Sequence, residues 1–374
     1  MARDIDVRES IEDTRSWFNV KRFKIGDASF ERPEKALDFK NLTRDQFKRA
    51  KGRFNFQFAE ASKLVREASN VLEVVDSNND YEIQKFFCKK EWLGKIPRVV
   101  NLTFEFSPFE LKPKQLSGFL DYHYQYSTLL LTVPNIRTEG TRQETIVDLK
   151  NYLKFVDSAY EILDAKNHKP IFVPISLRFG LTDIGKLLEY YFQKGYPNLW
   201  FDFEARAIKE TTLGKLRFIS TRIRENKNRK NIITYYTNIK REVSSHEKID
   251  DSPASDVLAS IAGANIIGVN REPRRKPGLG GMLISLENKN RVLDNTTYYY
   301  QKVTDRKLQD RSECTLINSV ILAKEFQAQR DKLFETHDIG EYISKKKMLK
   351  DNPQLLRELI QKSGKESGLG RFFE

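Results

Sequence analysis

The middle of the chain alternates short apolar runs with amphipathic segments. Six runs rich in β-branched or aromatic residues predict strands, and they read "PRVVNLTFEF", "STLLLTVPNI", "KPIFVPISLRF", "NLWFDFEA", "NIITYYTNI" and "ANIIGVNR". The segments between them place apolar residues at helical spacing. Strict alternation of strand and helix is typical of parallel strands joined by helical crossovers, and near-continuous apolar strands are covered on both faces.

This pattern predicts an α/β fold, a (β/α)8 TIM-like barrel with an N-terminal extension and C-terminal helices. One or two N-terminal strands would complete the ring. A doubly wound open sheet is the alternative, but no Gly-rich dinucleotide loop follows an early strand. We expect residues 1–95 to be an N-terminal extension that contributes the first barrel elements, 96–280 to be the barrel core, and 281–374 to hold an irregular insertion and C-terminal helices.

Outside the barrel core the pattern is mixed. "RFKIGDASFERP" predicts two short strands around a Gly-Asp turn, and residues 43–75 carry helical spacing with Thr43 as a plausible cap. "SPASDVLASIAG" predicts a helix before the last barrel strand. "NSVILAKEFQAQRDKLF" and "IGEYISKKKMLKDNPQLLRELIQ" predict C-terminal helices.

The net charge of the chain says more about its partners than its overall composition does. The chain has 374 residues, with 65 Lys and Arg against 52 Asp and Glu, and its formal net charge is +13. A positive excess of this size favours a polyanionic partner such as RNA, DNA or another phosphate ligand. The alternative is that charged helix faces are simply solvated, as in many thermophile proteins.

Cysteine usage and hydropathy exclude several classes. Cys88 and Cys314 stand far apart and match no metal-ligand spacing, which argues against a disulfide framework or a cysteine zinc site. No apolar stretch is long enough to cross a membrane, and the first ten residues lack the apolar region of a secretory signal. We therefore expect a cytoplasmic protein without a metal or other cofactor, which could form homo- or hetero-oligomers.

Polar side chains follow the predicted strands, where the active sites of parallel barrels lie. The candidates for substrate binding at these strand ends are Glu105, Asn135, Arg178, Asn238 and Asn270. The stretch "WFDFEA" stands out because Asp202 interrupts an aromatic strand and Glu204, two residues on, should face the same side. We predict Asp202 and Glu204 as catalytic carboxylates, with Arg178 as the partner of Asp202. The alternative is an ion pair that only ties barrel strands together.

A dense basic cluster follows the last predicted strand. Arg271, Arg274, Arg275 and Lys276 lie in a short loop stiffened by two prolines. Holding several cations together costs self-repulsion, which phosphate would neutralise. We predict that these four residues contact nucleic-acid phosphates.

The order of helix, strand and Pro/Arg-rich loop resembles the end of the barrel in tRNA-guanine transglycosylases. The residues that carry the resemblance are Pro253, Asp256, Val257, Leu258, Gly263 and Arg274. The resemblance implies exchange of a base for a 7-deazaguanine within a polynucleotide. However, Gly268 and Asn265 stand where that family has carboxylates, and its three zinc cysteines and D-S-G-G-F-Q loop are missing.

Three functions remain open from the sequence. The first is a base-exchange enzyme of the transglycosylase type on RNA or DNA, with a 7-deazaguanine base as ligand and Asp202 and Glu204 as its carboxylates. The second is a non-catalytic nucleic-acid-binding subunit of the same fold. The third is a barrel enzyme that acts on a phosphorylated small molecule.

Overall fold

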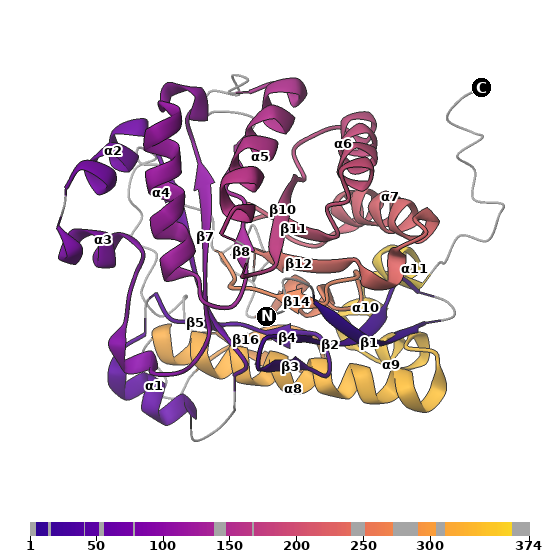
Figure 1. Cartoon of the computed structure of the whole chain (residues 1–374). Helices are drawn as coiled ribbons and strands as arrows, with labels where there is room; N and C mark the ends of the chain where they lie inside the picture. The colour runs from indigo at the N-terminus through magenta and orange to yellow at the C-terminus, as the bar shows by residue number, and fades with distance from the viewer. Residues whose placement is uncertain are drawn as a thin grey trace, which may run out of the picture.

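The centre of the protein is a closed ring of parallel strands with helices around it (Figure 1). The computed structural model describes residues 5–13, 16–40, 42–51, 56–77, 79–137, 147–166, 168–240, 251–271, 291–303 and 311–360. Two strands of the ring are split, one into β4 (Glu34–Lys35) and β5 (Leu37–Asp38), the other into β8 (Leu131–Thr132) and β9 (Asn135–Ile136).

The strand order closes the ring. The six-stranded sheet runs β4-β14-β12-β11-β10-β8 and the four-stranded sheet runs β5-β6-β7-β9, so the split strands join the two sheets at both ends. The remaining strands are β6 (Ala59–Val65), β7 (Arg98–Phe104), β10 (Ile171–Ser176), β11 (Asn198–Asp202), β12 (Ile233–Thr237) and β14 (Ile266–Ile267). Neighbouring strands of the ring that pair do so in parallel. The predicted (β/α)8 barrel is confirmed.

The helices between the strands largely follow the predicted pattern. They are α1 (Arg44–Lys51), α2 (Ala68–Asp76), α3 (Asp80–Phe86), α4 (Pro113–Tyr126), α5 (Leu149–Asp164), α6 (Leu181–Lys194) and α7 (Glu210–Glu225). The side chain of Asp148 accepts a hydrogen bond from Asn151 N at 2.8 Å and caps α5. Gly195 ends α6 with φ +74°, a left-handed conformation that costs glycine little.

Two segments differ from the sequence prediction. Strand β6 lies inside the segment predicted to be helical, and α1 and α2 flank it. The predicted helix over 252–263 is replaced by strand β13 (Asp251–Pro253) and the 3-10 turn η4 (Ser255–Leu258). Pairing of β13 with β16 (Tyr299–Lys302), in which Pro253 lies opposite Tyr299, holds the start of this segment extended.

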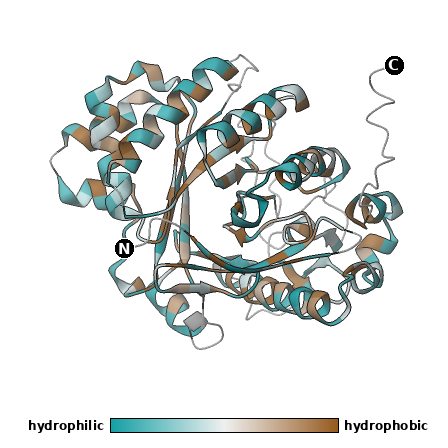
Figure 2. Ribbon diagram, turned by 45° about the vertical axis from the view of Figure 1, so that its right-hand side comes forward, coloured by the Kyte–Doolittle hydropathy of each residue, from teal (hydrophilic) through white to brown (hydrophobic). Residues whose placement is uncertain are grey.

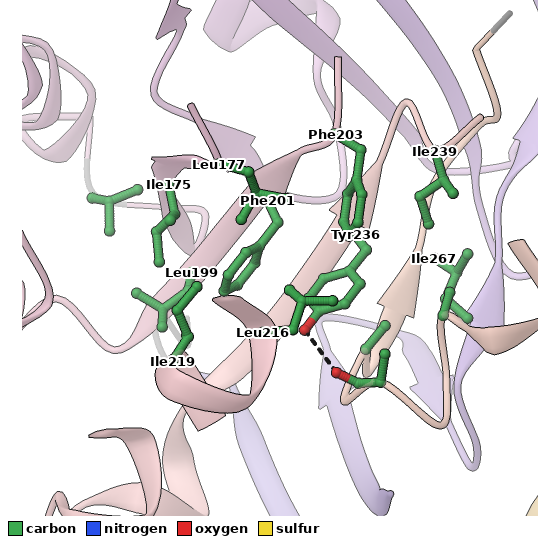
Figure 3. Close-up of a cluster of buried hydrophobic side chains, with 14 of the residues drawn as sticks. Ile175, Leu177, Leu199, Phe201, Phe203, Leu216, Ile219, Tyr236, Ile239 and Ile267 are labelled. Carbon is green, nitrogen blue, oxygen red and sulfur yellow. Dashed lines mark hydrogen bonds between the residues drawn. The ribbon is translucent and has the colours of Figure 1, made fainter. Parts of the chain in front are cut away.

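Alternation along β11 separates the two faces of the barrel wall. Leu199 and Phe201 belong to the outer core, which also includes residues of α7 such as Leu216 (Figure 3). Trp200 belongs instead to the core inside the barrel. The outer helices carry both hydrophobic and hydrophilic residues (Figure 2), as expected of helices with one face on a sheet. The alternation predicts that Asp202, two residues after Trp200, faces the interior.

An N-terminal antiparallel sheet packs on the apolar layer of the barrel interior. It contains β1 (Asp6–Glu12), β2 (Asn19–Ile25) and β3 (Ala28–Phe30), so the predicted hairpin is present as β2 and β3. The rings of Phe23 and Phe30 stack with centroids 4.6 Å apart and join a core with Trp200 and Phe172 of the barrel. These contacts fill one end of the interior with apolar side chains.

The C-terminal part lies against the barrel. It contains β15 (Arg291–Asp294), β16, α8 (Arg311–Thr336), α9 (Gly340–Ser344), α10 (Lys347–Lys350) and α11 (Pro353–Ile360). The side chain of Asp13 accepts a hydrogen bond from Ile339 N at 2.6 Å and so ties the N-terminal segment to these helices. Among the described helices, none is long and apolar enough to cross a membrane.

Candidate functional site

Two carboxylates lie at the carboxyl end of β11. Asp202 is 1% exposed, and its Oδ2 accepts a hydrogen bond from Thr103 Oγ1 at 2.6 Å. Its Oδ1 accepts two more, from Asn238 Nδ2 at 2.8 Å and from Glu204 N at 2.9 Å. Both oxygens of Asp202 are therefore satisfied, and one of them fixes the backbone of Glu204.

The carboxylate of Glu204 is held differently. Its Oε2 accepts hydrogen bonds from Arg178 Nε at 2.5 Å and from Arg137 Nε at 3.3 Å. Its Oε1 is buried and has no hydrogen-bond partner among the described residues. Burial raises the pKa of Glu204, and the negative charge of Asp202 adds to the increase, while Arg178 and Arg137 oppose it.

The backbone around this carboxylate is in the left-handed region. Glu204 has φ +50°, Ala205 has φ +63° and Asn238 has φ +57°. Ala205 N donates to Asn238 O at 2.9 Å, which links the ends of β11 and β12. For a residue other than glycine this conformation costs about 1–2 kcal/mol, and such strain is concentrated at functional sites.

Three predicted substrate-binding residues lie in this cluster. Glu105 forms an ion pair with Arg137, Arg178 binds Glu204, and Asn238 binds Asp202. The predicted partner of Arg178 was Asp202, but the salt bridge that the structure gives it is with Glu204. Arg137 and Arg178 are only one-fifth exposed, at 21% and 19% of their side-chain area, and they cover the buried carboxylate.

The other two predicted substrate-binding residues have described hydrogen bonds to other partners than Asp202 and Glu204. Asn135 Oδ1 accepts a hydrogen bond from the hydroxyl group of Tyr152 on α5 at 2.9 Å. Asn270 Oδ1 accepts from Lys35 Nζ at 2.7 Å, and its Nδ2 donates to Asp256. Asn135 nevertheless lies opposite Thr103, which donates to Asp202, in the pairing of β9 with β7.

The predicted phosphate-binding loop is described only at its start. Arg271 N donates to Ile239 O at 3.0 Å, which continues the pairing between the ends of the last two strands. Arg274, Arg275 and Lys276 lie outside the described residues.

Sequence reasoning missed a third buried carboxylate, Glu60 on β6. Its Oε1 accepts from Thr237 Oγ1 at 2.5 Å, and its Oε2 accepts from the Tyr235 hydroxyl at 2.5 Å and from Val269 N at 3.0 Å. Burial raises the pKa of Glu60, although these hydrogen bonds oppose the shift. The signal that could have revealed it is one acidic residue at an alternate position of "FAEASKLV", but this segment also has helix-forming composition.

A buried lysine closes the seam between the first and last strands. Lys35 Nζ donates to Gly268 O and to Asn270 Oδ1, and burial lowers the pKa of Lys35 to about 8. The negative charges of Asp256 and Glu60 oppose this shift. Within the described ranges, no group of three or more His, Cys, Asp or Glu residues could hold a metal ion.

Comparison with known proteins identifies no family. No protein-family model matches the chain, and no curated protein matches it. Solved structures that match include an endo-β-1,4-mannanase from Cellulomonas fimi, at 13% identity and TM-score 0.40, covering 67% of this chain and 68% of the mannanase. A fungal β-1,4-galactanase matches at 11% identity and TM-score 0.42, covering 77% and 98% of the two chains.

A third match is the carboxyl transferase domain of Rhizobium etli pyruvate carboxylase. Its identity is 10% and its TM-score 0.42, and the alignment covers 79% of this chain and 48% of that one. Likenesses this weak carry no argument about substrate or reaction, and the barrel assignment stands on the strand pairing itself.

The resemblance to tRNA-guanine transglycosylases is wrong. The matching structures above are a mannanase, a galactanase and a carboxyl transferase, and no family model supports the transglycosylase assignment. The predicted base exchange on RNA or DNA with a 7-deazaguanine ligand is corrected with it. The structure adds a physical reason, because a Cβ atom on Gly268 would lie 2.1 Å from Glu60 Oε2. The carboxylate of Glu60 already occupies the space that a nucleophilic side chain at position 268 would need.

Proposed function

We propose that the chain is a barrel enzyme that acts on a small molecule, in which Glu204 transfers a proton at the carboxyl end of the strands. The observation that carries this proposal is the asymmetry of the buried Glu204 carboxylate. One oxygen is held by two guanidinium groups, and the other has no partner in the described part of the chain. A perturbed, desolvated carboxyl at the working end of a barrel is a typical general acid or base.

The proposed chemistry uses the two oxygens of Glu204 differently. Arg178 and Arg137 hold Oε2 and fix the plane of the carboxyl group, which leaves Oε1 to exchange a proton with a bound substrate. Because burial raises the pKa of Glu204, both protonation states become accessible closer to neutral pH. The guanidinium groups would also stabilise negative charge that develops beside them on the substrate.

Asp202 has a positioning role in this proposal. It accepts the backbone N–H of Glu204 at 2.9 Å and the amide of Asn238 at 2.8 Å, and so supports the strained turn that presents Glu204. A fixed buried anion nearby also keeps the pKa of Glu204 high.

A phosphorylated substrate is consistent with the charge around the site. Arg137 and Arg178 carry the part-exposed cationic groups over Glu204, and Arg271 lies at the end of the last strand. Guanidinium groups bind phosphate oxygens with matched geometry. A nucleic-acid partner stays a prediction from the net charge and from the basic cluster of Arg271, Arg274, Arg275 and Lys276.

Glu204→Gln tests the proposed role. The purified protein is incubated with a metabolite mixture that includes sugar phosphates, and compounds consumed are followed by mass spectrometry. The wild type and the exposed control Glu225→Gln should consume the same compound, whereas Glu204→Gln should slow this by about 10²–10⁴-fold. Unchanged turnover in Glu204→Gln, or no compound consumed by the wild type, would overturn the proposal.

A further inference from the structure

Within the described residues, two buried acceptor oxygens at the ends of neighbouring strands have no hydrogen-bond donor. Glu204 Oε1 and Asn238 Oδ1 are both unpartnered, in residues that are 8% and 1% exposed. Buried polar atoms in folded proteins nearly always have a partner, so each exception requires an explanation. Two exceptions on neighbouring strand ends point to a ligand that supplies the missing donors.

Asp202 anchors both the side-chain amide of Asn238 and the backbone of Glu204. Asn238 Nδ2 and Glu204 N donate to the same oxygen of Asp202, at 2.8 and 2.9 Å. A carboxylate oxygen accepts and does not donate, so the nitrogen of the Asn238 side chain must face Asp202 and its oxygen must face away. The amide therefore cannot turn over to satisfy its own acceptor without losing the bond to Asp202.

The backbone keeps the two residues together. Ala205 N donates to Asn238 O at 2.9 Å, and Phe203 N donates to Thr237 O at 3.0 Å. Arg178 and Arg137 hold the other oxygen of Glu204. A half-turn of the carboxyl group would only swap its two oxygens and would still leave one of them without a partner. The unpaired acceptors are thus a built feature of the strand ends.

We infer that each of these two oxygens accepts a hydrogen bond from a ligand hydroxyl group, so that the substrate of the enzyme proposed above is a polyhydroxylated small molecule. This inference rests on the proposed function in so far as the ligand is a substrate, whereas binding of the ligand requires no reaction. A hydroxyl group fits better than an ammonium or amide N–H, because it donates to an ionised Glu204 and accepts from a protonated one. Asn238 Oδ1 takes the second hydroxyl hydrogen.

Two matched pairs of probes test the inference by calorimetry. Glycerol 3-phosphate and propyl phosphate have the same charge and chain length and differ by two hydroxyl groups, and glycerol and 1-propanol repeat the comparison without phosphate. We expect the hydroxylated member of at least one pair to bind about tenfold to a hundredfold more tightly, as expected for two hydrogen bonds.

Two variants then locate the preference. In Asn238→Gly the new glycine tolerates the φ of +57° at this position, but the side-chain acceptor is removed. This variant should reduce the preference for the hydroxylated probe about fivefold. Thr103→Val is the matched control, because it also removes one donor to Asp202 but neither acceptor. Its preference should stay at the wild-type value, and circular dichroism confirms that both variants fold.

The outcomes separate this inference from the proposed function. Equal binding within both pairs, no binding of either hydroxylated probe, or an equal loss of preference in Thr103→Val and Asn238→Gly would overturn the hydroxyl assignment, whatever Glu204→Gln does to turnover. A clear preference together with full turnover by Glu204→Gln would leave the hydroxyl site standing and remove the catalytic role of Glu204.

Discussion

Gly268 is the position where one added methyl group should disturb the barrel most. A Cβ atom at residue 268 would lie 2.1 Å from Glu60 Oε2, 2.7 Å from Thr237 Oγ1 and 2.8 Å from Thr237 Cβ. Nonbonded carbon and oxygen atoms do not approach this closely, so in Gly268→Ala the Glu60 side chain has to move by about an ångström.

The cost follows from the hydrogen bonds that Glu60 would lose. Its Oε2 accepts from Tyr235 at 2.5 Å and from Val269 N at 3.0 Å, and an ångström of displacement breaks both. Hydrogen bonds to a charged group contribute about 1.5–3 kcal/mol each, and partial relaxation recovers some of this. We expect Gly268→Ala to lower the free energy of unfolding by about 3–5 kcal/mol, a large fraction of the stability of an ordinary domain.

Urea denaturation followed by fluorescence measures this free energy, with Gly214→Ala as the matched control. Gly214 lies in α7, and a Cβ there would meet nothing within 4 Å. The same substitution should therefore stabilise the protein by about 0.5–1 kcal/mol through helix propensity. Opposite signs for one substitution at two glycines separate a local clash from a general effect of added methyl groups.

A double-mutant cycle with Glu60→Ala tests the cause. Once the carboxylate is gone, the cost of Gly268→Ala should fall by at least half, with the contact to Thr237 accounting for the remainder. If Gly268→Ala costs under about 1 kcal/mol, or costs the same with and without Glu60, then the close packing of Glu60 on Gly268 is not what fixes this position.

Three further predictions concern single groups. Burial raises the pKa of Glu34 to about 7, above its ordinary value of 4.5, so the unfolded chain ionises first and the folded state loses stability as pH rises from 4.5 to 7. Glu34→Gln should therefore stabilise the protein by about 2–3 kcal/mol at pH 8 and by little below pH 4.5, as urea titrations at both pH values will show. Burial lowers the pKa of His123 to about 4, so the unfolded chain takes up a proton first as pH falls below 6.5, and the resulting loss of stability between pH 6.5 and 4 should be absent in His123→Gln. Gly195→Ala should cost about 1 kcal/mol in thermal unfolding because residue 195 has φ +74°, and a neutral result would contradict the strain argument.

The barrel was predictable because its later strands have a clear sequence pattern. From β7 onward, apolar runs buried on both faces alternate with amphipathic helices, and this pattern has few other solutions. The two-residue repeat of a strand accounts for Asp202, which follows Trp200 of the inner core, whereas Glu204 lies beyond the end of β11 in a left-handed turn. Local pattern was sufficient where each strand buries apolar residues on both sides.

Strand β6 could not be predicted in the same way. Its sequence "AEASKLV" consists largely of residues that favour helices, and its interior position is a charged residue, Glu60. What holds it extended is pairing with β7 along its whole length, from Ala59 opposite Arg98 to Val65 opposite Phe104. The partners of Glu60 on β12 are more than 170 residues away in sequence, at separations of 175 and 177, so no local window contains the reason for this strand.

Three of the buried carboxylates, Glu60, Asp202 and Glu204, differ in how their oxygens are satisfied. Glu60 and Asp202 each have both oxygens bonded to hydroxyl, amide or backbone donors. A carboxylate in that state holds strands and turns in place, and proton exchange would cost it hydrogen bonds it already makes. Of these three, Glu204 combines two cationic partners on one oxygen with a second oxygen that has no partner among the described residues. Asp202 and Glu204 look equivalent in the sequence because both are acidic residues at the end of the same strand. Their hydrogen-bond donors distinguish them: Asp202 is fully bonded and supports the turn, whereas Glu204 keeps one oxygen available for proton transfer.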